Sequence, residues 1–250
     1  KKMKNKKSHE FALYAPAICQ SKLSKDKEVI INNSDMYHRL VNVLRIKKND
    51  KIVLFDEVYN ACICIDLIAK KHITAKVLEV NQNNTLNPHI ILGLPLLKKA
   101  NLDEAIYNCV ELGVNEIQIV ITQKVQRKWG GKKELERCQK IAIAAAEQSK
   151  NYTVALIHEP IRISYFVEKN ISGLKLLADP EGENIFKVLK SDFKSQEKII
   201  LFVGPEGGLE DYEISELKAN SFATVKLTPT TLRSVQAASA LVAIVRSWQD

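Results

Sequence analysis

The sequence predicts an α/β fold with a largely parallel sheet, preceded by a small β-barrel domain, and a change of pattern along its 250 residues supports this class. Between residues 11 and 80, short segments rich in Ile and Val are separated by Asn, Asp and Lys clusters, which is typical of closely spaced strands. From Pro88 onward, strands alternate with helices, which implies right-handed crossovers between parallel strands. The polar run 81–85 has no periodicity, so we expect domains over residues 1–82 and 83–250.

The first domain is expected to contain five strands, at residues 11–15, 29–32, 51–56, 61–68 and 73–80. One helix over residues 35–45 interrupts them, because its apolar side chains recur at helical spacing and leave Arg39 and Arg45 at the rim. Cys62 and Cys64 are two residues apart in an apolar strand, so both side chains are expected to face the core.

The second domain is expected to contain strands at residues 90–94, 117–121, 154–157, 174–178, 199–203 and 223–227. Helices are expected at residues 102–112, 134–149, 185–189 and 234–248. In residues 134–149, the predicted buried stripe consists of Leu135, Cys138, Ile141, Ala142 and Ala145.

The net charge of +8 is concentrated at the front of the chain. Residues 1–85 contain sixteen Lys and Arg against nine Asp and Glu, whereas the remaining residues contain twenty-one against twenty. This asymmetry favours a polyanion-binding module joined to a nearly neutral one, although the lysines among the first seven residues are equally compatible with a solvated tail. We predict contacts with RNA phosphates by Arg39 and Arg45, together with Lys124 and Arg127 of the basic loop 124–133.

Several classes of protein are excluded by the pattern. No apolar run approaches the roughly 18 residues of a membrane-spanning helix, and the short apolar stretch near the N-terminus is interrupted by Pro16, so a cytoplasmic protein is expected. Five cysteines argue against a disulfide framework, and no spacing of Cys and His completes a metal site. Phosphate-loop, nucleophile-elbow, zinc-protease and dinucleotide fingerprints are absent.

Two loops carry the functional signal. The buried strand 199–203 ends in Gly204-Pro-Glu-Gly-Gly208, where bare backbone allows N–H groups to approach a ligand. A second loop, Thr228-Pro-Thr-Thr231, follows the strand 223–227. Because ligands of open α/β sheets bind at the carboxyl ends of the strands, the two loops indicate a small-ligand pocket beside a basic, nucleic-acid-facing module.

The motifs around these loops resemble those of a known family. Gly204-Pro-Glu-Gly-Gly208 after an apolar strand, followed by residues 227–233 opening a C-terminal helix, is similar to the RsmE family of 16S ribosomal RNA uridine N3-methyltransferases, in the SPOUT class. Three further segments resemble that family in the same order along the chain: residues 38–50, residues 111–117 and residues 139–149.

The resemblance implies a PUA-like barrel for residues 1–82 and, after it, an α/β domain whose C-terminal part forms a trefoil knot. It further implies a homodimer that binds S-adenosylmethionine and acts on 16S ribosomal RNA, free or within the small ribosomal subunit. The cofactor pocket is expected to be formed by Leu177, Ala178, Gly204, Glu206, Gly207, Leu227, Thr228 and Leu232. Arg233 is expected to lie nearest the uracil, and Glu206 is a second catalytic candidate that orients groups or accepts the proton from N3.

One segment departs from the family pattern. The usual Thr-Glu-Thr-Ala after Leu-Arg is Ser234-Val-Gln-Ala237 here, and Thr228 replaces a typical glycine. Two interpretations follow: a divergent active enzyme, or a homologue that binds RNA without catalysis. A third possibility within the same class is methylation of a ribose 2′-hydroxyl.

Overall fold

The computed structural model describes residues 11–19, 23–169, 172–192 and 197–248. The chain divides into two compact units. The first is Lys1–Asn84 together with Lys150–Thr153, and the second is Thr85–Ser149 with Val154–Asp250. The short segment Lys150–Thr153 belongs to the first unit because it packs there, with the ring of Tyr152 5.4 Å from that of Phe55 and its carbonyl accepting an amide hydrogen bond from Asn83.

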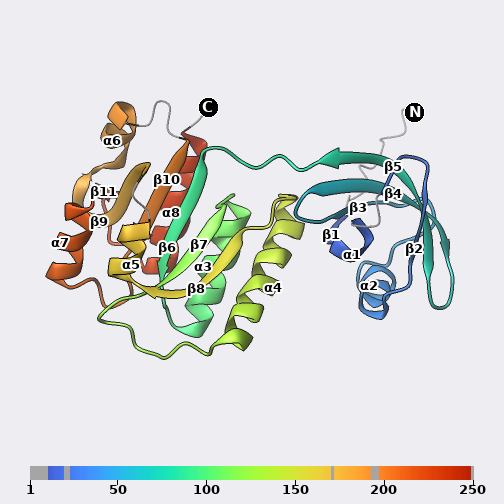
Figure 1. Ribbon diagram of the computed structural model, residues 1–250, viewed down its shortest axis with the longest axis horizontal. Coiled ribbons are helices and arrows are strands. Elements are labelled where there is room, and N and C mark those ends of the chain that lie inside the picture. Colours follow the sequence, from blue (N-terminus) through green and yellow to red (C-terminus); the bar gives the residue numbers. More distant parts are fainter. Residues whose placement is uncertain (1–10, 20–22, 170–171, 193–196, 249–250) are drawn as a thin grey trace. The chain divides into compact units, whose positions relative to one another are not determined.

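The first unit contains a five-stranded sheet in the order β1-β3-β4-β5-β2 (Figure 1). Its described strands pair antiparallel except for β1 with β3. The strands are β1 (Phe11–Tyr14), β2 (Glu28–Ile31), β3 (Lys51–Phe55), β4 (Tyr59–Ile68) and β5 (Ile73–Gln82). Helix α1 (Pro16–Cys19) was not anticipated from the sequence.

The helix of the first unit differs from the predicted regular helix. Asn33 accepts hydrogen bonds from two backbone amides and starts α2 (Ser34–His38), which widens into the π-helix η1 (Arg39–Val43). Arg45 then adopts a left-handed conformation with φ of 54°. π-Helical turns are rare and occur frequently at functional sites, so this helix end is an unusual local structure.

The prediction that Cys62 and Cys64 face the core is wrong. The fully buried residues of β4 are Ala61, Ile63 and Ile65, and the two cysteines lie half-buried on the other face. Strand β4 is apolar on both faces here, so the alternation of its side chains does not reveal which face is buried.

The second unit is an α/β domain with a parallel sheet, as the sequence predicts. Its six-stranded sheet has the order β11-β9-β10-β6-β7-β8, and every described pair is parallel. The strands are β6 (His89–Pro95), β7 (Glu116–Ile121), β8 (Leu156–Arg162), β9 (Leu174–Asn184), β10 (Lys198–Val203) and β11 (Ala223–Lys226). The helices are α3 (Lys99–Glu111), α4 (Lys132–Ser149), α5 (Ile163–Lys169), α6 (Ile185–Asp192), α7 (Asp211–Ala219) and α8 (Ser234–Ser247).

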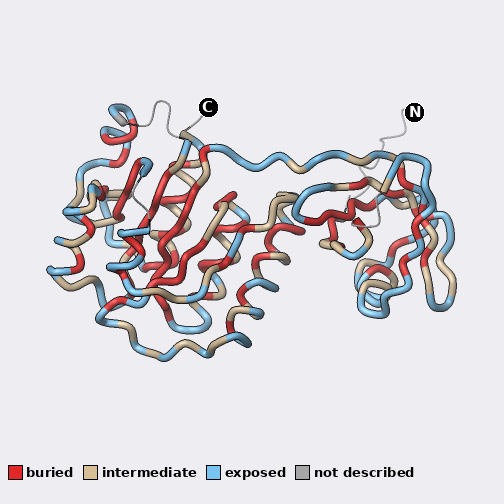
Figure 2. Tube along the Cα trace, viewed as in Figure 1, coloured by how far each residue is buried: buried red, intermediate tan, exposed pale blue. Residues whose placement is uncertain are grey.

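Helices cover both faces of this sheet. Helices α5 and α7 pack on one face through an aromatic cluster in which the Phe166 and Phe202 rings lie 5.5 Å apart, whereas α8 contacts β6 and β10 on the other face beside α3. Figure 2 shows the buried residues concentrated along the central strands. Gly93 is required by this packing, because a Cβ atom there would approach the Phe202 ring to 2.5 Å.

The second unit differs from the sequence-based prediction in its strand bounds and its helices. Strand β9 extends to Asn184, beyond the predicted end at residue 178, and β8 covers Leu156–Arg162 where residues 154–157 were expected. Helices α5 and α7 were not anticipated, and the buried face of α4 contains the carboxylates Glu134 and Glu147 where Leu135 and Ile141 were expected. Among the described residues, no helix is long and apolar enough to cross a membrane.

Candidate active site

The loop after β10 is a tight turn at the carboxyl edge of the parallel sheet. Its backbone closes through a hydrogen bond from the Gly208 amide to the Pro205 carbonyl, 2.9 Å long. Gly208 has a φ of 72°, in the left-handed region where a side chain is strained. The turn directs the backbone of residues 204–208 toward the space beyond the strand ends.

A cavity of about 380 Å³ lies beside this turn, between the carboxyl ends of β10 and β11 and the middle of β9, where the pairing of β9 with β10 ends at Ala178. Seven of the eight residues expected to bind a cofactor line it: Leu177, Ala178, Gly204, Glu206, Leu227, Thr228 and Leu232. Gly207 does not line it, because this residue faces the neighbouring loop, where an added Cβ would lie 3.3 Å from the Cβ of Lys124. The volume lies within the range of about 300–1,000 Å³ typical of small-molecule sites.

The lining is largely apolar with a few polar groups. Leu209, Ile214 and Val225 add apolar surface, and the Thr228 hydroxyl donates a hydrogen bond to the Thr230 carbonyl over 2.7 Å. Asp179 lines the cavity but was not anticipated, whereas Thr230 and Thr231 belong to the predicted second ligand loop. The sequence feature that could have predicted Asp179 is its position directly after the apolar segment 174–178.

The two catalytic candidates occupy different positions. Glu206 lines the cavity, and one of its carboxylate oxygens accepts a hydrogen bond of 2.8 Å from the side chain of Asn101 on α3. Arg233 is exposed and precedes α8, between the cavity residues Leu232 and Ser234, but it is not part of the lining. Among the described residues, the Arg233 guanidinium has no ion pair or hydrogen bond, so it remains available to a ligand.

The loop between β7 and α4 packs against the turn after β10. The Lys124 ammonium lies 3.3 Å from the Glu210 carboxylate and 3.4 Å from the Leu209 carbonyl oxygen. The buried carboxylate of Glu213 accepts hydrogen bonds from the backbone amides of Gln123, at 2.8 Å, and of Glu210, at 2.9 Å. These contacts fix one wall of the cavity to the neighbouring loop.

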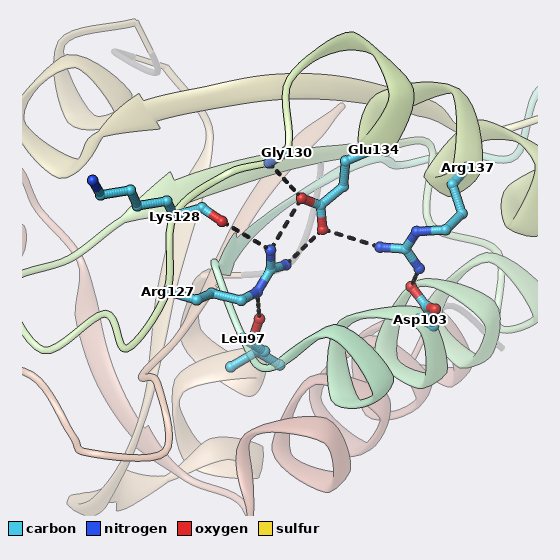
Figure 3. A network of polar contacts seen from close by, with 7 residues as sticks. All are labelled: Leu97, Asp103, Arg127, Lys128, Gly130, Glu134 and Arg137. Carbon is cyan, nitrogen blue, oxygen red and sulfur yellow. Dashed lines mark hydrogen bonds and ion pairs between the residues drawn. The ribbon is translucent and has the colours of Figure 1, made fainter.

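Arg127 has a different environment from the one predicted. Its guanidinium pairs with Glu134 at 2.8 Å and donates to the Leu97 carbonyl at 2.6 Å (Figure 3). Glu134 also accepts from the Gly130 amide and from Arg137, which in turn pairs with Asp103. The charge of Arg127 is therefore neutralised by the buried carboxylate of Glu134 on α4, and its guanidinium is engaged within the protein.

The other two predicted RNA-contacting arginines lie in the first unit. Arg39 and Arg45 are both exposed; Arg39 begins the π-helical segment, and Arg45 follows its C-cap, Leu44. Their exposure is compatible with phosphate contact, which stays a prediction.

Comparison with known proteins identifies the family. The family model of the RNA methyltransferase domain matches residues 84–246. Ribosomal RNA small subunit methyltransferase E from Synechocystis is 32% identical over 218 residues, covering 84% of this chain and 70% of that protein. This chain belongs to the ribosomal RNA small subunit methyltransferase E family. The member from Mesomycoplasma hyopneumoniae is 28% identical and covers 84% of this chain and 89% of its own length.

Solved structures of the family share the same fold. The Neisseria gonorrhoeae ribosomal RNA small subunit methyltransferase E, bound to S-adenosylmethionine, matches with a TM-score of 0.83 and 27% identity over 96% of this chain and 98% of that one. A Legionella pneumophila methyltransferase with bound S-adenosylmethionine has a TM-score of 0.82 at 22% identity, over 95% of this chain and 97% of that one, and supports the fold alone.

The departure from the family pattern at residues 234–237 lies at the start of α8. Val235 is 5% exposed and does not line the cavity, whereas Ser234 and Ala237 do. In this chain, therefore, the side chain that replaces the usual acid packs in the core of the second unit.

Proposed function

We propose that this protein transfers a methyl group from S-adenosylmethionine to N3 of a uridine in 16S ribosomal RNA. The observation that carries the proposal is the cavity at the carboxyl edge of the sheet, where the loops after β10 and β11 and the middle of β9 converge on a single space of suitable size. Membership of the methyltransferase family, and a relative with bound S-adenosylmethionine, support S-adenosylmethionine as the ligand of this cavity.

The residues of the cavity fit this cofactor. The side chains of Leu177, Leu227 and Leu232 would hold the adenine, and the backbone at Gly204 and Gly208 leaves polar groups accessible to it. The hydroxyls of Thr228 and Thr230 and the carboxylates of Glu206 and Asp179 offer partners for its ribose and amino-acid groups. When bound, the cofactor supplies a methyl group on a sulfonium, which is already an activated donor.

The protein must then position N3 of the base next to the methyl group and accept the proton that N3 loses. Arg233 supplies a cation at the start of α8 that favours the deprotonated, anionic base. Glu206 has one oxygen engaged by Asn101, and its other oxygen is the candidate acceptor for the proton. Because N3 lies on the pairing edge, the uridine must be unpaired or extruded to react.

Further features of the proposal come from the resemblance to the family. We propose that the first unit is a PUA-like barrel that binds ribosomal RNA through Arg39 and Arg45, and that the C-terminal part of the second unit forms a trefoil knot. We also propose that the protein works as a homodimer in the cytoplasm on free RNA or the assembled small subunit. The basic excess of residues 1–85 supports the RNA-binding role.

The experiment is a methyl-transfer assay with labelled S-adenosylmethionine, using 16S ribosomal RNA and small ribosomal subunits as separate substrates. Label is expected in RNA with one of the two, and digestion to nucleosides should place it on the base of a uridine. Label on the ribose would favour 2′-O-methylation. Cofactor and RNA binding without any transfer would favour the non-catalytic homologue.

A further inference from the structure

The loop between β7 and α4, residues 122–131, crosses the carboxyl edge of the parallel sheet. Through Arg127 it is attached to the Leu97 carbonyl after β6, and through Lys124 to Leu209 and Glu210 after β10. The loop contains Lys124, Arg127 and Lys128 and no Asp or Glu, and the first two residues of α4 are also lysines. This basic loop therefore lies along the edge at which the cavity is located, and any RNA that delivers a base to the cavity must approach the same edge.

A partly buried network centred on Glu134 makes this loop rigid (Figure 3). The Glu134 carboxylate, 9% exposed, is shared by the guanidinium groups of Arg127 and Arg137 and by the Gly130 amide. Gly130 is closely packed there, because a Cβ atom would lie 2.9 Å from a Glu134 carboxylate oxygen. Paired charges with little exposure are screened weakly by solvent, so the conformation of residues 127–130 is well determined.

Adjacent residues of this loop have opposite roles. Arg127 is neutralised inside the network, and the carbonyl of Lys128 also accepts a hydrogen bond from it. The Lys128 side chain extends away from the network in Figure 3 and is exposed. Within the described part of the chain its ammonium makes no ion pair, so its charge is unpaired at the sheet edge.

We propose that Lys128 contacts a phosphate of the substrate RNA, and that the ion pair of Arg127 with Glu134 positions it. This inference depends on the proposed function, because RNA is the expected polyanion at this edge. A lysine ammonium suits a single phosphate as a point charge, and the fixed backbone reduces the conformational entropy lost on contact. Arg127 is then a positioning residue, and its own cation does not contact the RNA.

The test compares Lys128→Ala with Lys140→Ala, which removes the same charge from an exposed position further along α4. Binding of a 16S ribosomal RNA transcript and of small ribosomal subunits is measured over a series of salt concentrations. Lys128→Ala is expected to weaken binding about three- to tenfold at low salt and to reduce the salt slope by about 0.7–0.9, the contribution of one phosphate contact. Lys140→Ala should change the affinity by less than about twofold, and neither variant should alter binding of S-adenosylmethionine.

Arg127→Lys, alone and combined with Lys128→Ala, tests the positioning role. A lysine cannot reproduce the forked hydrogen bonds, so Arg127→Lys is expected to weaken RNA binding in the wild-type background and to have little further effect when Lys128 is absent. Additive effects of the two substitutions on RNA affinity would mean that Arg127 affects RNA binding independently of Lys128, which would overturn its positioning role.

Equal effects of Lys128→Ala and Lys140→Ala, or an unchanged salt slope, would overturn the phosphate contact. A change in oligomeric state with unchanged RNA affinity would overturn it in favour of a protein contact. The wild-type protein is assayed for methyl transfer in the same preparation. Absence of methylation there contradicts the proposed function, whereas normal methylation with an inert Lys128→Ala contradicts only this inference.

Discussion

Replacement of Glu213 by Gln is expected to loosen the wall of the cavity, because this buried carboxylate joins two loops. Its two oxygens accept one backbone N–H each, from Gln123 and from Glu210, and the side chain is 1% exposed. A glutamine keeps one accepting oxygen and turns an NH2 group toward the second N–H. One charge-assisted hydrogen bond is lost, and one buried donor is left without a partner.

The magnitude follows from these two changes. A hydrogen bond to a charged group contributes about 1.5–3 kcal/mol, and an unsatisfied buried donor costs about 1–3 kcal/mol. The free energy of unfolding of the second unit is therefore expected to fall by about 2.5–6 kcal/mol, which lowers Tm by roughly 5–24 °C for a domain of this size. Leu209 and Ile214 adjoin these contacts and line the cavity, so affinity for S-adenosylmethionine should fall as well.

Calorimetric unfolding and titration with S-adenosylmethionine measure both effects. The matched control is Asp211→Asn, which makes the same chemical change in the first turn of the same helix at an exposed position and should lower stability by less than about 0.5 kcal/mol. If Glu213→Gln unfolded and bound the cofactor like Asp211→Asn, the proposed link between the two loops would be refuted.

Three further predictions follow from the site and the sheet. Ala178→Leu adds a larger side chain to the cavity lining and is expected to weaken S-adenosylmethionine binding at least tenfold while circular dichroism stays unchanged; normal affinity would remove the cofactor from this cavity. Arg233→Ala should lower the rate of methyl transfer by orders of magnitude at saturating cofactor, with cofactor affinity little changed, whereas parallel loss of stability or binding would indicate a structural arginine. Burial raises the pKa of Glu116, but hydrogen bonds from His89 and His158, each 2.7 Å long, outweigh this and hold its pKa below the usual value. Because its pKa is lowered on folding, the carboxylate stabilises the fold at pH values above the pKa of the unfolded state, and this contribution is lost as pH falls through the folded pKa. Glu116→Gln should therefore be destabilised by about 1–2 kcal/mol near neutral pH and should match the wild type in acid. An equal difference in stability at both pH values would contradict this.

The sequence predicts the parallel sheet and the position of the ligand loops for clear physical reasons. Strand β10 is apolar from Ile199 to its end at Val203, directly before Gly204, so both its burial and its end are visible in the sequence. The carboxyl edge of a parallel sheet then brings together segments that are separated along the chain, as it does for Ala178 within β9 and Thr228 after β11. Their role in binding remains a prediction.

Other features depend on contacts that local pattern does not show. Arg127 occurs in a basic loop, and its partner Glu134 is a residue type that is usually exposed on a helix. Only the folded chain shows that Arg127 donates to the Leu97 carbonyl and that Glu134 accepts from the Gly130 amide. Helix α7 buries little apolar surface, so its sequence shows only a weak amphipathic pattern. The hydrogen bonds that Glu213 makes to the neighbouring loop depend on the tertiary structure and cannot be read from the sequence. Gly207 was assigned to the cavity with its neighbours, although the turn directs it toward Lys124.

The central claim is tested most directly by mapping methylated nucleotides in 16S ribosomal RNA by mass spectrometry, from cells with and without this protein. The account predicts one uridine that carries a base methyl group, identified as N3-methyluridine against a standard, only when the protein is present, and restored by the wild-type gene but not by Arg233→Ala. Identical methylation maps in the two strains, or a difference confined to ribose methylation, would contradict it.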